Sequence, residues 1–167
     1  MEHSQTLTLG VDLGLHKSYL AVVEPGQPAR VVEVVGAENP QLTAALNRLL
    51  ATYPIALAVV EGLTRRPLKG RMDSESFRAL RRLGHRVSGL LLAQGIEVLR
   101  PRAVEAMGWQ REEGPGWRQA FTGLTRPREQ DVIRRLLELQ QEGRLAGEVP
   151  RNPHAADAVG MALVGAA

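Results

Sequence analysis

The stretch TLTLGVDLGLHKSYLAVVEPGQPARVVEVVG, residues 6–36, decides the fold class. It opens with an alternating and then continuously apolar run that ends in Asp-Leu-Gly, which is typical of a β-strand whose last residue is Asp12. Two further β-rich runs lie on either side of the turn sequence EPGQP, residues 24–28, and this arrangement predicts a hairpin. Three consecutive antiparallel strands are therefore expected at the start of the chain.

Helical and strand patterns alternate after residue 36. A helix is predicted over residues 39–54, where Asn39 can cap the first turn and Pro40 suits its first position. The apolar run IALAVV, residues 55–60, predicts a central strand covered on both faces and followed by Glu61. Helices are also expected at residues 74–94, 101–108, 128–143 and 153–167, and a strand at residues 96–101.

This order of elements predicts an α/β protein with a mixed five-stranded sheet, its first three strands antiparallel, flanked by helices. The length of 167 residues suits a single domain, residues 1–167, with its own core. Residues 108–127 contain both tryptophans and a Gly-Pro-Gly turn but no clean period, so we expect a loop or partly ordered insertion there. For Trp109 and Trp117, packing is favoured over stacking on bases.

The composition excludes several classes of protein. The chain has no cysteine, so neither a disulfide framework nor a thiolate metal site can form, and a reducing cytoplasmic setting is expected. The first residues lack the pattern of a secretory signal, and no run approaches the ~18 apolar residues that span a bilayer. We therefore expect a soluble protein with no membrane partner.

Basic residues are concentrated in the middle of the chain. Residues 62–111 hold eleven Lys or Arg against four acids, whereas the rest of the chain holds ten against fourteen. Nineteen of the 21 basic residues are Arg, whose guanidinium group suits bidentate contacts with phosphate. This uneven charge favours a polyanionic partner, although a GC-rich genome would give the same preference for Arg.

Four potential metal ligands lie at the ends of predicted elements. Asp12 ends the first strand and Glu61 follows the fourth, so parallel neighbouring strands would bring both carboxylates to one edge of the sheet. His154 and Asp157 are three residues apart, on one face of the last helix. Because Asn152 can cap that helix and Pro153 suits its first position, both side chains are expected in its first turn.

Three carboxylates and one imidazole suit Mg²⁺ or Mn²⁺ better than a structural zinc site. Two such ions can activate a water and stabilise the leaving oxygen in phosphodiester hydrolysis. Taken singly, three of the residues have a plainer explanation: Asp12 as a turn residue, His154 as a surface side chain, and Asp157 as a favourable charge at a helix N-terminus. Glu61 is harder to explain in this way, because a carboxylate at the end of a strand should be solvated, paired or metal-bound. Together they favour hydrolytic phosphoryl transfer.

These motifs resemble the RuvC-type Holliday-junction resolvases of the ribonuclease H-like superfamily. LGVDLGLHKSYLAVVE, residues 9–24, resembles their first strand and hairpin, and ALAVVEG, residues 56–62, their fourth strand. VLRPRAVEAMG, residues 98–108, resembles the segment that supports their active site, and PHAADAVGMAL, residues 153–163, their final acidic helix. The resemblance extends in order over nearly the whole chain.

The resemblance implies an endonuclease that resolves four-way DNA junctions by paired phosphodiester hydrolysis, in recombination, repair or phage DNA processing. It implies a homodimer, two Mg²⁺ or Mn²⁺ ions in each active site and no nucleotide cofactor. The implied catalytic residues and metal ligands are Asp12, Glu61, His154 and Asp157. The basic side chains expected to bind DNA phosphates are Arg65, Arg66, Lys69, Arg71, Arg78, Arg81 and Arg82.

Other functions are compatible with parts of the pattern. The same ligand set would serve a related nuclease in RNA processing or transposition, and a DNA-junction-binding protein without catalytic activity could keep the fold. The motif GVDLG, residues 10–14, also resembles the first phosphate loop of actin-like ATPases and sugar kinases. Those proteins are much longer and need a second phosphate motif, which we do not find in this sequence.

Overall fold

The computed structural model describes residues 5–62, 74–101 and 116–167. Its sheet has the strand order β5-β4-β1-β2-β3-β6. The strands are β1 (Leu7–Asp12), β2 (Lys17–Glu24), β3 (Ala29–Glu38), β4 (Ile55–Val60), β5 (Glu97–Leu99) and β6 (Leu145–Ala146).

The strand directions agree with the prediction. β1, β2 and β3 are consecutive antiparallel neighbours, and β4 lies parallel to β1 on its other side. β5 is parallel to β4, and β6 is parallel to β3. The predicted five-stranded sheet was one strand short, because the two residues of β6 are too few to give a periodic signal in the sequence.

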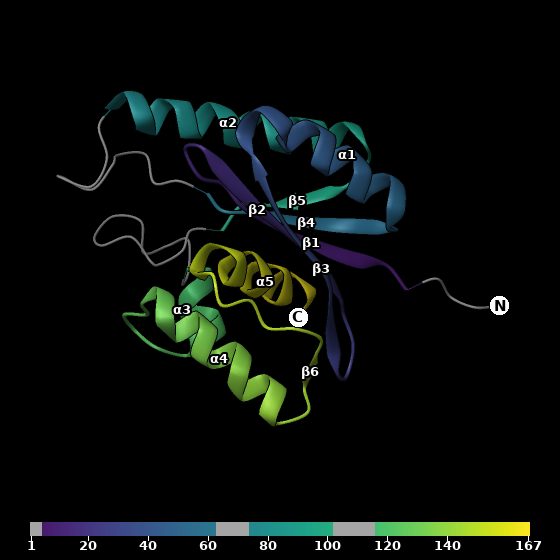
Figure 1. Ribbon diagram of the computed structural model, residues 1–167, viewed down its shortest axis with the longest axis vertical. Coiled ribbons are helices and arrows are strands. Elements are labelled where there is room, and N and C mark those ends of the chain that lie inside the picture. Colours follow the sequence, from purple (N-terminus) through teal and green to yellow (C-terminus); the bar gives the residue numbers. More distant parts are fainter. Residues whose placement is uncertain (1–4, 63–73, 102–115) are drawn as a thin grey trace.

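Helices cover both faces of the sheet (Figure 1). One face carries α1 (Leu42–Thr52), which follows the short 3₁₀ helix Asn39–Gln41, and α2 (Ser74–Ala93). The other face carries α3 (Trp117–Thr122), α4 (Glu129–Gln141) and α5 (Pro153–Ala166). No helix in the part of the chain that the structure describes is both long and apolar enough to cross a membrane.

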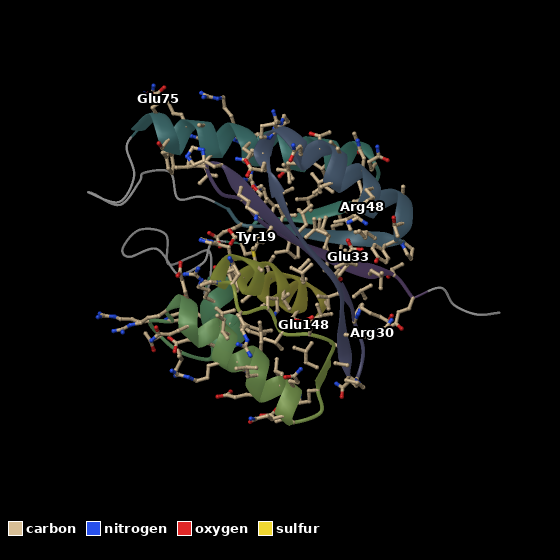
Figure 2. The ribbon with its side chains drawn as sticks, viewed as in Figure 1. Tyr19, Arg30, Glu33, Arg48, Glu75 and Glu148 are labelled. Atoms are coloured by element: carbon tan, nitrogen blue, oxygen red, sulfur yellow. The ribbon has the colours of Figure 1, made fainter. Side chains whose placement is uncertain are left out.

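The alternation of side chains along the strands divides the core into two clusters. In β1, Leu7, Leu9 and Val11 face α1 and α2, where Leu46 and Leu91 complete the first cluster. The second cluster joins the opposite face of the sheet to α3, α4 and α5; its strand residues include Ala21, Val23 and Val59. Figure 2 shows the side chains between sheet and helices, with Glu33 of β3 close to Arg48 of α1, its ion-pair partner.

Small residues bring α5 close to β1. A Cβ atom added at Gly10 would lie 1.8 Å from the backbone oxygen of Ala158, so a larger residue would separate the helix from the strand. Ala155, Ala156 and Ala158 are buried in the same helix. This close packing places the first turn of α5 beside the end of β1.

One local prediction was wrong. Asn39 does not cap α1; it lies in the 3₁₀ helix, where its side chain accepts a hydrogen bond from Ser18 and donates one to the Gly14 carbonyl, both at 2.8 Å. Within residues 108–127, expected to form a loop or partly ordered insertion, Trp117–Thr122 form the short helix α3. Six residues are too few for a helical period, and the burial of Trp117 in the second core stabilises the helix. The predicted helix at residues 101–108 and Trp109 lie outside the described residues.

Candidate active site

The parallel pairing of β1 and β4 brings Asp12 and Glu61 together. Val11 is paired with Val60. Asp12 follows Val11 as the last residue of β1, and Glu61 follows Val60 directly after β4. Because side chains alternate, Asp12 is on the same face as Gly10, and Glu61 on the same face as Val59. Helix α5 covers that face. The parallel pairing of β1 with β4 confirms the expectation that both acids lie at one edge of the sheet.

The first turn of α5 adds His154 at this edge. The Asn152 side chain caps the helix, accepting hydrogen bonds from the backbone N–H groups of His154 at 2.9 Å and Ala155 at 3.2 Å, as predicted. Nδ1 of His154 lies 3.2 Å from Oδ2 of Asp12. The His154 ring stacks on Tyr19, with 6.2 Å between ring centroids, yet the side chain remains 60% exposed. His154 therefore forms the solvent-facing rim of the site.

Asp157 lies deeper in the site and is only 2% exposed. Its Oδ2 forms an ion pair with Arg118 of α3. Its Oδ1 is buried and has no hydrogen-bond partner among the residues that the structure describes. A buried carboxylate oxygen without a partner is energetically costly, and a bound cation would remove that cost.

Trp117 and Arg118 are site residues that the sequence prediction missed. Nε1 of Trp117 donates a hydrogen bond of 2.8 Å to Oε2 of Glu61, while the neighbouring Arg118 binds Asp157. Both belong to α3, in the stretch where the sequence predicts a loop. The only feature of the sequence that could have pointed to these two residues is the pair Trp-Arg in an irregular segment. Such a pair does not indicate that either residue binds a carboxylate.

Burial raises the pKa of all three carboxyl groups of the site. Burial raises the pKa of Asp12 to about 8, and the neighbouring charges of Glu61 and Asp157 contribute to this rise. Burial also raises the pKa of Glu61, against the lowering effect of the hydrogen bond from Trp117, and part of this residue still reaches solvent. The pKa of Asp157 is likewise raised by burial, against the effect of Arg118. These acids therefore release their protons less readily than exposed carboxyl groups do.

The donor set fits a hard divalent cation. Asp12, Glu61 and Asp157 offer carboxylate oxygens, His154 offers a ring nitrogen, and the orphaned Oδ1 of Asp157 needs a partner. Within the described residues, no three such side chains converge into a ready metal cage.

Basic side chains lie on α2 and at the end of β5. Arg78, Arg81 and Arg82 are exposed on α2, as expected for phosphate-binding residues. Arg100 is not among the predicted phosphate-binding residues. It lies close to Gly84, where an added Cβ would be 2.6 Å from Nη2 of Arg100. Burial and the charge of Arg81 lower the pKa of Arg100. The other predicted DNA contacts, Arg65, Arg66, Lys69 and Arg71, lie outside the described residues.

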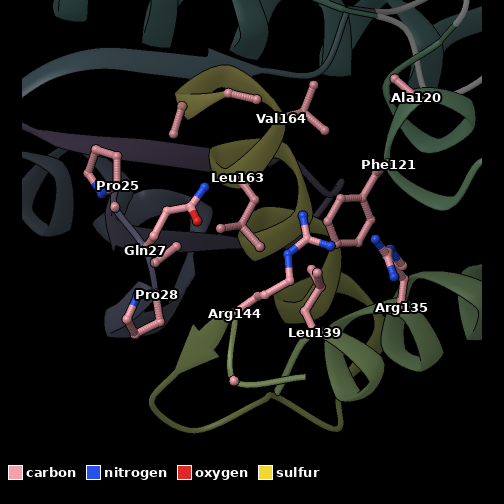
Figure 3. A pocket seen from close by; sticks show the side chains of 15 residues that line it. Pro25, Gln27, Pro28, Ala120, Phe121, Arg135, Leu139, Arg144, Leu163 and Val164 are labelled. Atoms are coloured by element: carbon pink, nitrogen blue, oxygen red, sulfur yellow. The ribbon is translucent and has the colours of Figure 1, made fainter. Parts of the chain in front are cut away.

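An open pocket of about 720 Å³ lies away from the acids, beside the β2–β3 turn (Figure 3). Pro25, Phe121, Leu139 and Leu163 line it, together with Arg135. None of the four predicted ligands reaches it, and it offers no carboxylate cluster. The carboxylate edge is therefore the better candidate for the active site.

The fold is that of known junction resolvases, although neither a protein-family model nor a characterised protein matches the sequence. The RuvC structure from Thermus thermophilus has a TM-score of 0.69 and 16% identity, and the match covers 95% of this chain and 92% of that one. T. thermophilus RuvC in complex with a Holliday junction substrate has a TM-score of 0.70, 19% identity and the same coverage. The yeast mitochondrial Holliday junction resolvase Ydc2 has a TM-score of 0.60 and 12% identity, with 97% of this chain and 78% of that chain covered. The chain therefore has the ribonuclease H-like fold of RuvC-type resolvases.

Proposed function

We propose that this protein is a metal-dependent, structure-selective endonuclease that resolves four-way DNA junctions by paired phosphodiester hydrolysis. The observation that carries the proposal is the gathering of Asp12, Glu61, His154 and Asp157 at one edge of the sheet. The fold adds support, since the structural neighbours include T. thermophilus RuvC bound to a Holliday junction.

The proposed mechanism assigns separate tasks to the site residues. Asp12, Glu61, Asp157 and His154 would hold Mg²⁺ or Mn²⁺. When bound, these ions supply an activated water and a positive charge that stabilises the leaving oxygen. His154 lies at the exposed rim, where its Nδ1 shares a hydrogen bond with Oδ2 of Asp12 and can hold a proton near the substrate.

The arginines of α2 would bind the DNA backbone. Arg78, Arg81 and Arg82 are exposed and can contact phosphates without reading sequence. Arg100 adds a partly buried positive charge near Arg81. Junction DNA is a polyanion, so these side chains provide affinity, and the carboxylate edge provides the chemistry.

Two symmetric cuts in one junction require two active sites, so we propose a homodimer. Val87 and Leu91, in the apolar half of α2, belong to the core of the monomer and are buried. Leu92 is 59% exposed on the same helix and is a candidate contact with a second subunit. Analytical ultracentrifugation of the protein and of its Leu92→Glu variant would test this part of the proposal.

The proposal is tested by incubating the protein with a mobile four-way junction and either Mg²⁺ or Mn²⁺. Paired nicks at symmetric positions would support it. Binding without nicks would instead indicate a non-catalytic junction-binding protein. A preference for RNA–DNA hybrid or structured RNA over the junction would indicate a related nuclease of the same fold.

A further inference from the structure

We propose that Trp117 and Arg118 are positioning residues of the metal site: each holds one oxygen of a carboxylate so that the other oxygen can bind the metal. The two residues are adjacent on α3, and they bind different candidate ligands, Glu61 and Asp157. The inference rests on the proposed function, because it requires these carboxylates to be metal ligands.

Trp117 is held rigidly in the core. The side chain of Trp117 is 1% exposed, and its ring lies against Gly160 of α5. A Cβ atom added at Gly160 would lie 2.9 Å from Cζ3 of Trp117 and 3.2 Å from a methyl group of Val132. The ring can therefore occupy this place only because residue 160 has no side chain. A ring fixed in this way also fixes the direction of its N–H group, which lies 2.8 Å from Oε2 of Glu61.

Arg118 is fixed by two interactions. Its guanidinium group is an ion-pair partner of Oδ2 of Asp157, and it lies 5.6 Å from the centre of the Trp117 ring. Its side chain is only 18% exposed, so water competes weakly for it. Among the described residues, Oδ1 of Asp157 has no partner, as expected for a carboxylate with one oxygen held and the other left for a ligand.

Side chains that bind the ligands of a metal ion, as Trp117 and Arg118 would here, affect the metal affinity as well as the stability of the fold. Groups that hydrogen-bond to metal ligands orient them, and removing one typically lowers metal affinity by about 10- to 100-fold. A purely structural role predicts a lower unfolding temperature with unchanged metal affinity.

The first test replaces Trp117 with Phe, which removes the N–H donor without changing the charge. We expect Mn²⁺ affinity, measured by calorimetry and by the electron paramagnetic resonance signal of bound Mn²⁺, to fall about 10-fold. The matched control is Phe121→Leu, which trims another aromatic side chain of α3 at a residue that lines the distant pocket. Thermal unfolding in chelator identifies the folded fraction of each variant. Wild-type affinity in folded Trp117→Phe would overturn the inference for this residue.

The second test compares Arg118→Gln with Arg118→Lys. Loss of a positive charge by itself would strengthen cation binding. Because Arg118 also lowers the pKa of Asp157, its removal favours the protonated carboxyl group, so Mn²⁺ binding is measured over a range of pH. Weaker binding by Arg118→Gln that persists at high pH, where protons no longer compete, indicates lost orientation of Asp157. The Lys variant keeps one donor to Asp157 and should recover part of the affinity. Unchanged or tighter binding by Arg118→Gln would overturn the role of Arg118. If the wild-type protein itself binds no Mn²⁺, the proposed function fails together with this inference.

Discussion

Nδ1 of His154 lies 3.2 Å from Oδ2 of Asp12, although the two residues are 142 positions apart in the chain. This contact joins the first strand to the last helix. It exists because Asn152 caps α5 at a defined residue and because Gly10 lets the helix approach β1 closely. The geometry of the site therefore depends on the cap and the glycine as much as on the acids.

Asp12→Asn should abolish junction cleavage and leave junction binding intact. The amide keeps the shape of the side chain but removes the negative charge that would bind the cation. We expect cleavage to fall below detection in a gel assay with Mn²⁺, while the Kd for the junction changes less than about 3-fold, since phosphate contacts dominate affinity. Glu97→Gln, at an exposed acid of β5, is the control and should cleave normally. Substantial cleavage by Asp12→Asn would contradict the assignment.

The metal-free protein should become less stable as the pH rises from about 4 to about 8. The pKa of Asp12 is raised from 3.8 to about 8, so between these values the folded state binds a proton that the unfolded state has released. Folding stability therefore falls with increasing pH in this window. Thermal unfolding in chelator would show the decline, which should be shallower in Asp12→Asn. An unfolding temperature that rises across the window would refute the expected ionisation.

Much of the fold and part of the site follow from the sequence. The alternation in residues 6–36 predicts the antiparallel strands, and Asn152 with Pro153 predicts the start of α5, because caps and periods are local signals. The partners of Glu61 and Asp157 could not be predicted. Trp117 and Arg118 lie on a short helix and bind Glu61 and Asp157. Tertiary packing places this helix beside the acids, so the local sequence does not predict the contacts.

Arg81→Gln should weaken junction binding and reduce its dependence on salt. Arg81 is exposed on α2 and its charge acts on Arg100, so a phosphate bound between them would be attracted by both. Loss of one phosphate contact should lower the slope of log Kd against log salt by about 0.9. Arg134→Gln removes an equally charged residue from α4, whose side chain is 63% exposed, and serves as the control. Identical salt slopes for the two variants would exclude a specific contact at Arg81.

His154→Ala should slow cleavage about 100-fold with little effect on stability. A positioned proton carrier contributes about 100-fold or more. The side chain is 60% exposed, so its removal leaves no buried cavity, and the unfolding temperature should stay near that of the wild type. His154→Asp should retain part of the activity, with altered metal or pH preference, because a carboxylate can replace the imidazole next to Asp12.

Calorimetry with Mn²⁺ then separates the two roles. A ligand predicts weaker metal binding by His154→Ala, whereas a proton carrier predicts unchanged binding with a lower rate. Wild-type cleavage by His154→Ala would show that the residue has only a structural role.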